Sequence, residues 1–434
     1  MRVTAFEHYM YADDRRSAPM TFFVRAGFSG RPDPTRMRTA IRHAQMRHPL
    51  TRAVISGRRQ ARTRDLHWID APQPEPYIAF ATQAGPIDYP GGEPYLDLRR
   101  EVGLRFFFIE TDANRSELWI QVHHAICDGI GITRFLEDVL AEYAAPGSAG
   151  APPDRIELDA ALLDRRSEPG LGRRERLARL PIDILRGLRL FRPASPVASS
   201  QGGANRDPAA GGQPFPAHRS LDITPDGVDR LRSLARATDG TLNDLLLRNM
   251  FVAIDAHNRA SGGSRPVRLS MPTNLRDAKL AAMPAANVVG MAFLGRRPAA
   301  FEDPDGLLQG VVAETRHIKR HRAGLTLHRA VSAFGAIRGG LVWVCGPAHC
   351  HSTAVLSNLG RVFRDSPLAG TDGIMRAGDL VLDSYDLLPP IRPLTHLAVG
   401  VVEHAGGLRL SAHFNASAIT PSEADRILER VAGG

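Results

Sequence analysis

The stretch of sequence that decides the fold lies at residues 118–143 and reads LWIQVHHAICDGIGITRFLEDVLAEY. Its first residues, Leu118 to Val122, are mostly apolar and predict a buried strand. Apolar residues then recur at helical spacing and predict an amphipathic helix. They are Ile132, Phe135, Leu136, Val139, Leu140 and Tyr143. The segment between the two elements, His123 to Gly129, is therefore predicted to form a strand-to-helix turn.

Two adjacent histidines, His123 and His124, stand at the end of the predicted strand. Neighbouring strand residues point to opposite faces, so only one of the two rings faces a given cavity. Imidazole exchanges a proton near neutral pH, which suits a general base in acyl transfer. The plainer alternative is a pair of packed histidines followed by an ordinary Asp-Gly turn at Asp128 and Gly129.

Metal binding and a cysteine nucleophile are the other chemistries that the residue types suggest. His124 and Asp128 would share one face if they lay on a helix. A second dense cluster is formed by Cys345, His349, Cys350 and His351. Neither set has a convincing four-ligand spacing, so no metal site is predicted. We interpret Cys127, inside the turn, as a buried thiol.

The chain divides into two α/β lobes joined by a segment of different composition. Residues 1–145 alternate predicted strands and helices, including a helix that starts at Asp33-Pro34. Residues 146–215 are rich in Pro, Gly, Ser and Arg, which predicts a flexible connection. Order returns in residues 216–434, where Thr241 is predicted to cap a helix.

An amphipathic pattern lies inside the connection, where residues 173–192 place leucines and isoleucines among arginines. A helix packed on its own protein gives this pattern, and so does a helix that lies on a membrane surface. Both interpretations stay open.

Length and composition favour a two-domain protein of the cytoplasm. The 434 residues exceed the size of a single hydrophobic core. No apolar run approaches the roughly 20 residues of a membrane span, and no signal peptide or disulfide framework is visible. The net charge of +9 is almost wholly arginine. No basic run is interleaved with aromatic residues, so nucleic-acid binding is not predicted. A basic exterior favours carrier proteins, CoA phosphates or anionic lipid heads.

The histidine segment resembles the HHxxxDG signature of the chloramphenicol acetyltransferase-like superfamily. This superfamily includes condensation domains, wax ester/diacylglycerol acyltransferases and polyketide-associated acyltransferases. Five other segments are similar to its motifs and keep their order along the chain. They are Arg47-His48-Pro49-Leu50-Thr51-Arg52, Asp97-Leu98 followed by Leu104-Arg105, Thr241-Leu242-Asn243-Asp244, Pro272-Thr273-Asn274-Leu275-Arg276 and Ser357-Asn358-Leu359-Gly360. The "DFGWG" motif of the plant branch is absent, which argues against that branch.

The resemblance implies two chloramphenicol acetyltransferase-like lobes, each a mixed sheet flanked by helices, with the active-site tunnel between them. It implies that His124 is the general base and that His123, Asp128 and Gly129 belong to the same catalytic motif. It also implies an arginine partner for Asp128, for which Arg276 is the candidate. The candidate oxyanion or substrate contacts are Thr273, Asn274, Ser357 and Asn358.

The activity that the resemblance implies is transfer of an acyl group to the hydroxyl of a lipid, polyketide or sugar alcohol. The donor is the thioester of CoA or of an acyl carrier protein, and no bound cofactor is expected. Two alternatives stay open: a freestanding condensation enzyme that forms an amide, and a non-catalytic homologue that binds a carrier or lipid. Peripheral contact with the inner membrane is a further expectation.

Overall fold

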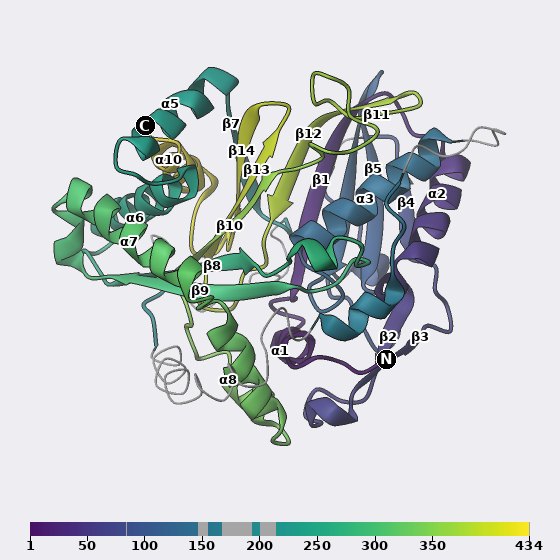
Figure 1. Ribbon diagram of the computed structural model, residues 1–434, viewed down its shortest axis with the longest axis horizontal. Helices are drawn as coiled ribbons and strands as arrows, with labels where there is room; N and C mark the ends of the chain where they lie inside the picture. Colours follow the sequence, from purple (N-terminus) through teal and green to yellow (C-terminus); the bar gives the residue numbers. More distant parts are fainter. Residues whose placement is uncertain (84, 146–154, 167–192, 200–213, 434) are drawn as a thin grey trace.

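The computed structural model describes residues 1–83, 85–145, 155–166, 193–199 and 214–433. It contains two large β-sheets that lie side by side, with helices on the outer side of each (Figure 1). This arrangement confirms the predicted α/β class with two lobes. The predicted amphipathic segment 173–192 and most of the predicted connection lie outside the described residues.

The first sheet has six strands in the order β11-β12-β1-β6-β5-β4. All neighbours are antiparallel except β4 and β5, which are parallel. Helices α2 (Pro34–Arg47) and α3 (Gly129–Ala144) pack together on its outer side. The strands are β1 (Thr21–Ser29), β4 (Tyr77–Ala81), β5 (Leu104–Asp112), β6 (Arg115–His123), β11 (Arg376–Ala377) and β12 (Leu380–Leu388).

The second sheet has six strands in the order β7-β14-β13-β10-β8-β9. Strand β10 runs parallel to both of its neighbours, and the other pairs are antiparallel. The strands are β7 (His218–Ile223), β8 (Val267–Asn274), β9 (Val289–Arg296), β10 (Ala354–Arg361), β13 (Leu397–His404) and β14 (Gly407–Phe414). The covering helices are α5 (Pro225–Arg236), α6 (Leu242–Ala260), α7 (Pro304–Arg320) and α10 (Pro421–Val431).

A smaller layer lies below the junction of the two sheets in Figure 1. It consists of α1 (Ala5–Asp13), α8 (Leu325–Gly335) and α9 (Gly340–Val344), which pack on one another. A two-stranded ribbon of β2 (Ala53–Ser56) and β3 (His67–Asp70) lies nearby. The layer brings the first helix of the chain against segments from its second half. No helix in the described part of the chain combines the length and apolar content needed to cross a membrane.

Sheet membership departs from the boundary expected from the sequence, which assigned all of residues 216–434 to the second lobe. Strands β11 and β12 instead belong to the first sheet. Strand β12 pairs with β1 from Phe23 opposite Leu388 to Ser29 opposite Val381. The physical reason is that an alternating strand pattern identifies a strand but carries no information on which sheet edge it joins.

The two sheets touch where β12 crosses β13. A Cβ atom on Gly400 would lie 1.9 Å from the backbone oxygen of Leu387, so only glycine allows this approach. Beside it, the buried Asp386 carboxylate of β12 accepts hydrogen bonds from Ser220 at 2.7 Å, Arg409 at 2.7 Å and Ser411 at 2.5 Å. These contacts join the sheets through both backbone and side chains.

Candidate active site

The strand-to-helix turn predicted from the sequence is confirmed. Strand β6 ends at His123, and α3 starts at Gly129 with Asp128 as its N-cap. The Asp128 carboxylate accepts a hydrogen bond from the Gly131 N–H at 2.9 Å, which satisfies one of the free donors of the first helical turn. The turn therefore holds both histidines between a sheet and a helix.

His123 is fully buried and points away from open space. Its Nδ1 accepts a hydrogen bond from the Ala125 N–H at 3.1 Å, and its Nε2 lies 3.6 Å from Oδ2 of the buried Asp14. Because Nδ1 is an acceptor, the ring proton resides on Nε2 and faces the carboxylate. His123 thereby ties the turn to the segment that follows α1.

His124 is half-buried and lines a narrow cavity of about 90 Å³ where the turn, α1 and the second sheet meet. Burial lowers the pKa of His124 from 6.5, against the opposing effects of its own backbone carbonyl and Asp128. The ring is therefore neutral at pH 7 and able to accept a proton. Most of the wall is apolar, from Met10, Met20, Met291, Phe293, Leu327 and Val355.

Asp128 and Arg276 form an ion pair between the turn and the segment after β8. Arg276 Nη1 lies 2.8 Å from Asp128 Oδ2, and Nη2 lies 3.0 Å from Oδ1. Oδ2 also accepts from the Val288 N–H at 2.8 Å. Asn287 donates to the backbone oxygens of His124 and Ala125 at 2.7 and 2.9 Å. The backbone of the turn is thus fixed from the second half of the chain.

Gly129 allows the second half of the chain to approach the start of α3. A Cβ atom at this position would lie 2.7 Å from Leu359 Cδ2. A larger residue would therefore displace Leu359, which follows Ser357 and Asn358 on β10. The glycine of the signature has a packing role in this structure.

The four candidate oxyanion or substrate contacts lie in different surroundings. Ser357 lines the cavity together with His124. Asn274 is exposed, and its side chain accepts from the Arg276 N–H at 3.0 Å. Asn358 donates to Asn243 at 3.2 Å and accepts from the Gly360 N–H at 2.8 Å. Thr273 is half-buried on β8. The cavity therefore brings together His124 and Ser357 but none of the other three.

Several cavity residues had no signal in the sequence. Arg392 and the buried Asp13 form a two-point ion pair on the cavity wall, with Nη2 3.0 Å from Oδ1 and Nε bonded to Oδ2. His351, which the sequence singled out only as part of the cysteine and histidine cluster, lies beside them, and burial together with the Arg392 charge lowers its pKa to about 4. Hydroxyl groups of Ser270, Ser352 and Thr395 also line the wall. The residues of the ion pair are 379 positions apart, so no local pattern links them.

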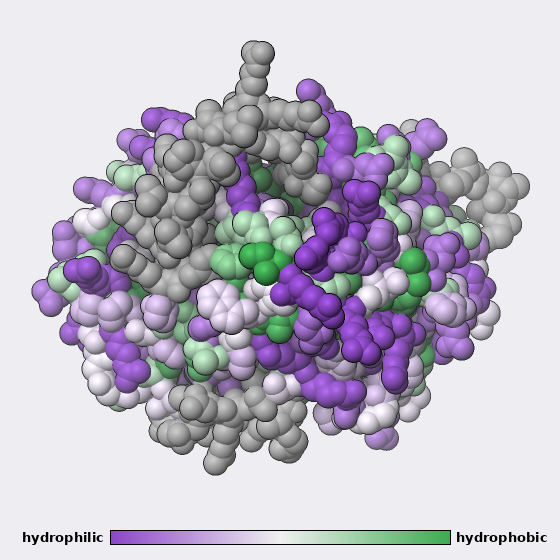
Figure 2. All heavy atoms as spheres, turned by 90° about the horizontal axis from the view of Figure 1, so that it is seen from below, coloured by the Kyte–Doolittle hydropathy of each residue, from purple (hydrophilic) through white to green (hydrophobic). Residues whose placement is uncertain are grey.

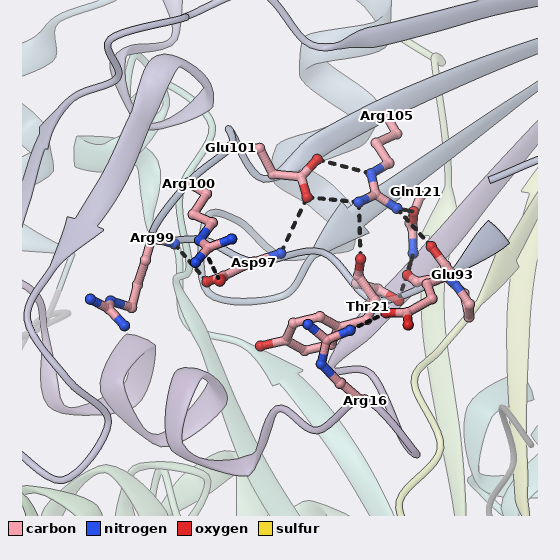
Figure 3. A network of polar contacts seen from close by, with 11 residues as sticks. Arg16, Thr21, Glu93, Asp97, Arg99, Arg100, Glu101, Arg105 and Gln121 are labelled. Atoms are coloured by element: carbon pink, nitrogen blue, oxygen red, sulfur yellow. Dashed lines mark hydrogen bonds and ion pairs between the residues drawn. The ribbon is translucent and has the colours of Figure 1, made fainter. Parts of the chain in front are cut away.

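A polar network beside the first sheet is centred on Arg105 (Figure 3). Arg105 of β5 is buried, and its Nη2 donates to Glu101 at 2.7 Å and to the Tyr95 backbone oxygen at 2.9 Å. This positions Tyr95, whose hydroxyl accepts from Arg59. Arg59 in turn lies 3.5 Å from Asp14 Oδ2. The network fixes the Asp14 side of the signature turn.

Cys127 is a buried thiol, as predicted from the sequence: it is fully buried, and burial raises its pKa. Cys345 and Cys350 are buried free thiols as well. Among the residues that the structure describes, no group of three histidine, cysteine or acidic side chains is placed to hold a metal ion.

No family model matches the chain. Two curated proteins of Mycobacterium tuberculosis, Uncharacterized protein Rv2305 of strain H37Rv and Uncharacterized protein MT2362 of strain CDC 1551, are 27% identical to it over 297 residues. The match covers 64% of this chain and 62% of each relative.

Solved structures match the whole fold at low sequence identity. The first condensation domain of the CDA synthetase aligns over 99% of this chain and 94% of that chain, with a TM-score of 0.68 and 17% identity. TRI3 trichothecene 15-O-acetyltransferase from Fusarium sporotrichioides aligns over 99% and 93%, with a TM-score of 0.66 and 13% identity. The starter condensation domain of rhizomide synthetase RzmA aligns over 100% of this chain and 92% of that chain, with a TM-score of 0.64 and 12% identity.

These likenesses define the class of fold. The chain has the two-lobed α/β fold of condensation domains and chloramphenicol acetyltransferase-like acyltransferases, as the sequence motifs predicted. In sequence, the chain resembles the two mycobacterial proteins described above.

Proposed function

We propose that the protein is an acyltransferase that moves an acyl group from the thioester of CoA or of an acyl carrier protein to a hydroxyl acceptor. The observation that carries the proposal is His124, a neutral imidazole facing a narrow, largely apolar cavity between the lobes. Proteins of the same fold support it. TRI3 is named an O-acetyltransferase, and the RzmA domain was solved with C8-CoA and Leu-SNAC.

In the proposed reaction, the ring of His124 accepts the proton of the acceptor hydroxyl while the hydroxyl oxygen attacks the thioester carbon. A carbon–oxygen bond forms, and the carbonyl oxygen becomes an oxyanion. When the intermediate collapses, the carbon–sulfur bond breaks and the leaving thiolate takes the proton from His124. The products are an ester and a free thiol.

The other residues of the motif act by positioning in this proposal. His123 and Asp14 hold one side of the turn, and Asp128 with Arg276 holds the other. Ser357 is the candidate hydrogen-bond donor for the oxyanion, because it is the one member of the four sequence candidates that lines the cavity with His124.

The apolar cavity wall favours an acyl chain as the group held beside His124, since methionine and phenylalanine side chains adapt to a flexible hydrocarbon. A freestanding condensation enzyme uses the same fold and an amine acceptor. Product analysis separates the two, because an ester and an amide differ in mass when alcohol and amine acceptors are offered together.

The test is release of free thiol from a series of acyl-CoA donors, with alcohols and amines as acceptors and the product identified by mass spectrometry. His124→Ala is expected to reduce turnover by about 10²- to 10⁴-fold with the fold intact. His404→Ala is the matched control, because His404 is also half-buried with a pKa lowered by burial but lies elsewhere. Near wild-type turnover of the His124 variant would exclude the mechanism. Acyl-CoA binding without thiol release for any acceptor would support the non-catalytic alternative.

A further inference from the structure

An exposed apolar surface lies at the junction of α8 and α9. Trp343 is 68% exposed and Ile337 is 60% exposed, the two highest values among the large apolar side chains of the described residues. They belong to one tight turn, because the Gly340 N–H donates to the Ile337 oxygen at 3.1 Å and the Trp343 N–H donates to the Gly339 oxygen at 2.9 Å. Exposed apolar groups gathered in this way mark an interaction site. We name this the Trp343 surface.

Arginine side chains border the Trp343 surface. The segment 58–64 packs against its turn, since the Gly339 N–H donates to the Gln60 oxygen at 2.9 Å. This segment exposes Arg58, Arg62 and Arg64, and the turn itself exposes Arg338. Within the described part of the chain, Arg58, Arg62 and Arg338 form no ion pair with an acidic side chain. Figure 2 shows apolar surface at the centre of the lower face, with a broad hydrophilic band beside it.

The Trp343 surface continues inward to the candidate active site. The Trp343 ring lies 6.2 Å from the ring of His349, which lies 6.2 Å from the ring of His351. His351 lines the same cavity as His124, and its Nε2 is bonded to the backbone oxygen of Val344 at the end of α9. A partner bound at the Trp343 surface would therefore lie next to one wall of the cavity.

We propose that the Trp343 surface docks on a phospholipid bilayer that contains anionic lipids. Indole is the side chain that settles at the headgroup level of membranes, and arginines beside it attract negative headgroups. In Figure 1, α8 and the neighbouring segment 58–64 project from the lower side of the molecule. A projecting apolar tip fits a deformable interface, whereas a protein partner would have to supply a matching pocket. The proposal concerns lipid binding and stands apart from acyl transfer.

The full chain is tested with vesicles of phosphatidylcholine containing phosphatidylglycerol, compared with vesicles of phosphatidylcholine alone. The chain has three tryptophans, and Trp68 and Trp119 are only 3% and 6% exposed. A blue shift of the emission therefore reports on Trp343. The expected results are a blue shift and co-sedimentation with the anionic vesicles, both weakened by salt.

Matched variants identify the surface. Ile337→Ser is expected to weaken vesicle binding about tenfold, and Arg62→Gln and Arg338→Gln are each expected to weaken it about fivefold. Leu234→Ser is the control, because Leu234 is 59% exposed but lies on α5. No blue shift with anionic vesicles would overturn the proposal, as would an equal loss in the Leu234 variant. Protection of Trp343 by an acidic carrier protein, without any vesicle binding, would also overturn it.

Discussion

Replacement of Asp128 and Arg276 by alanine, singly and together, tests whether their ion pair holds the signature turn to the second half of the chain. The side chains are 5% and 16% exposed, so both charges are largely withdrawn from water. Asp128→Ala removes a helix cap, which costs about 1 kcal/mol. It also leaves a poorly solvated guanidinium without its partner, which costs about 3 kcal/mol. The expected loss of unfolding free energy is therefore about 4 kcal/mol.

Arg276→Ala is expected to cost less, about 3 kcal/mol. The remaining carboxylate keeps two backbone donors, the N–H groups of Gly131 and Val288. The double variant is expected to lose about 5 kcal/mol, which is about 2 kcal/mol less than the sum of the single losses, because the residues are in contact. The measurement is urea unfolding of the full chain followed by near-ultraviolet circular dichroism, after a single transition has been established.

An exposed ion pair provides the control for this cycle. Asp372 and Arg376 are 44% and 48% exposed and lie 2.7 Å apart. Removing either of these two side chains is expected to leave the free energy of unfolding nearly unchanged, because water screens an exposed pair. If the double variant lost the same unfolding free energy as the sum of the Asp128 and Arg276 single variants, within about 0.5 kcal/mol, the coupling would be refuted. Asp128 would then be free for a direct role in catalysis.

Three further outcomes are expected. Burial lowers the pKa of His124 below 6.5. Because the base must be neutral, kcat/KM should rise with pH and reach half its plateau below pH 6.5; a midpoint above that value contradicts the assignment. Gly129→Ala should cost about 1 to 3 kcal/mol through the clash with Leu359, and Leu359→Ala in the same chain should restore part of the loss in thermal unfolding. Gly400→Ala should yield insoluble protein, since its Cβ meets backbone at 1.9 Å; a soluble, stable variant would show that β12 and β13 move apart easily.

Local sequence patterns predicted the elements around the turn because it lies between a regular strand and a regular helix. The strand ends at His123 and the helix starts at Gly129, as the apolar run and the helical spacing indicated. Caps at Asp33 and Thr241 likewise identified the starts of α2 and α6. The pairing of Asp128 with Arg276 was predicted from family resemblance and not from spacing, since 148 residues separate them.

Other parts of the site depend on contacts that no local pattern encodes. Asp13 and Asp14 are consecutive, yet one faces Arg392 on the cavity wall and the other faces His123 behind the turn. Adjacent acidic residues at the end of a helix are ordinary surface residues in sequence terms. Asp13 is buried against Arg392 from the second half of the chain, whereas Asp14 is buried against Arg59 and His123 of the first half.

The position of β12 has a consequence for dividing the molecule. A fragment limited to residues 1–199 would lack β11 and β12 and would present β1 as an open edge with a row of unpaired backbone donors and acceptors. Such edges recruit other chains and promote aggregation. The fragment should therefore be recovered in soluble form only when residues 214–434 are co-expressed to supply the missing strand. In this respect the two lobes behave as complementary halves of one folding unit and not as separable modules.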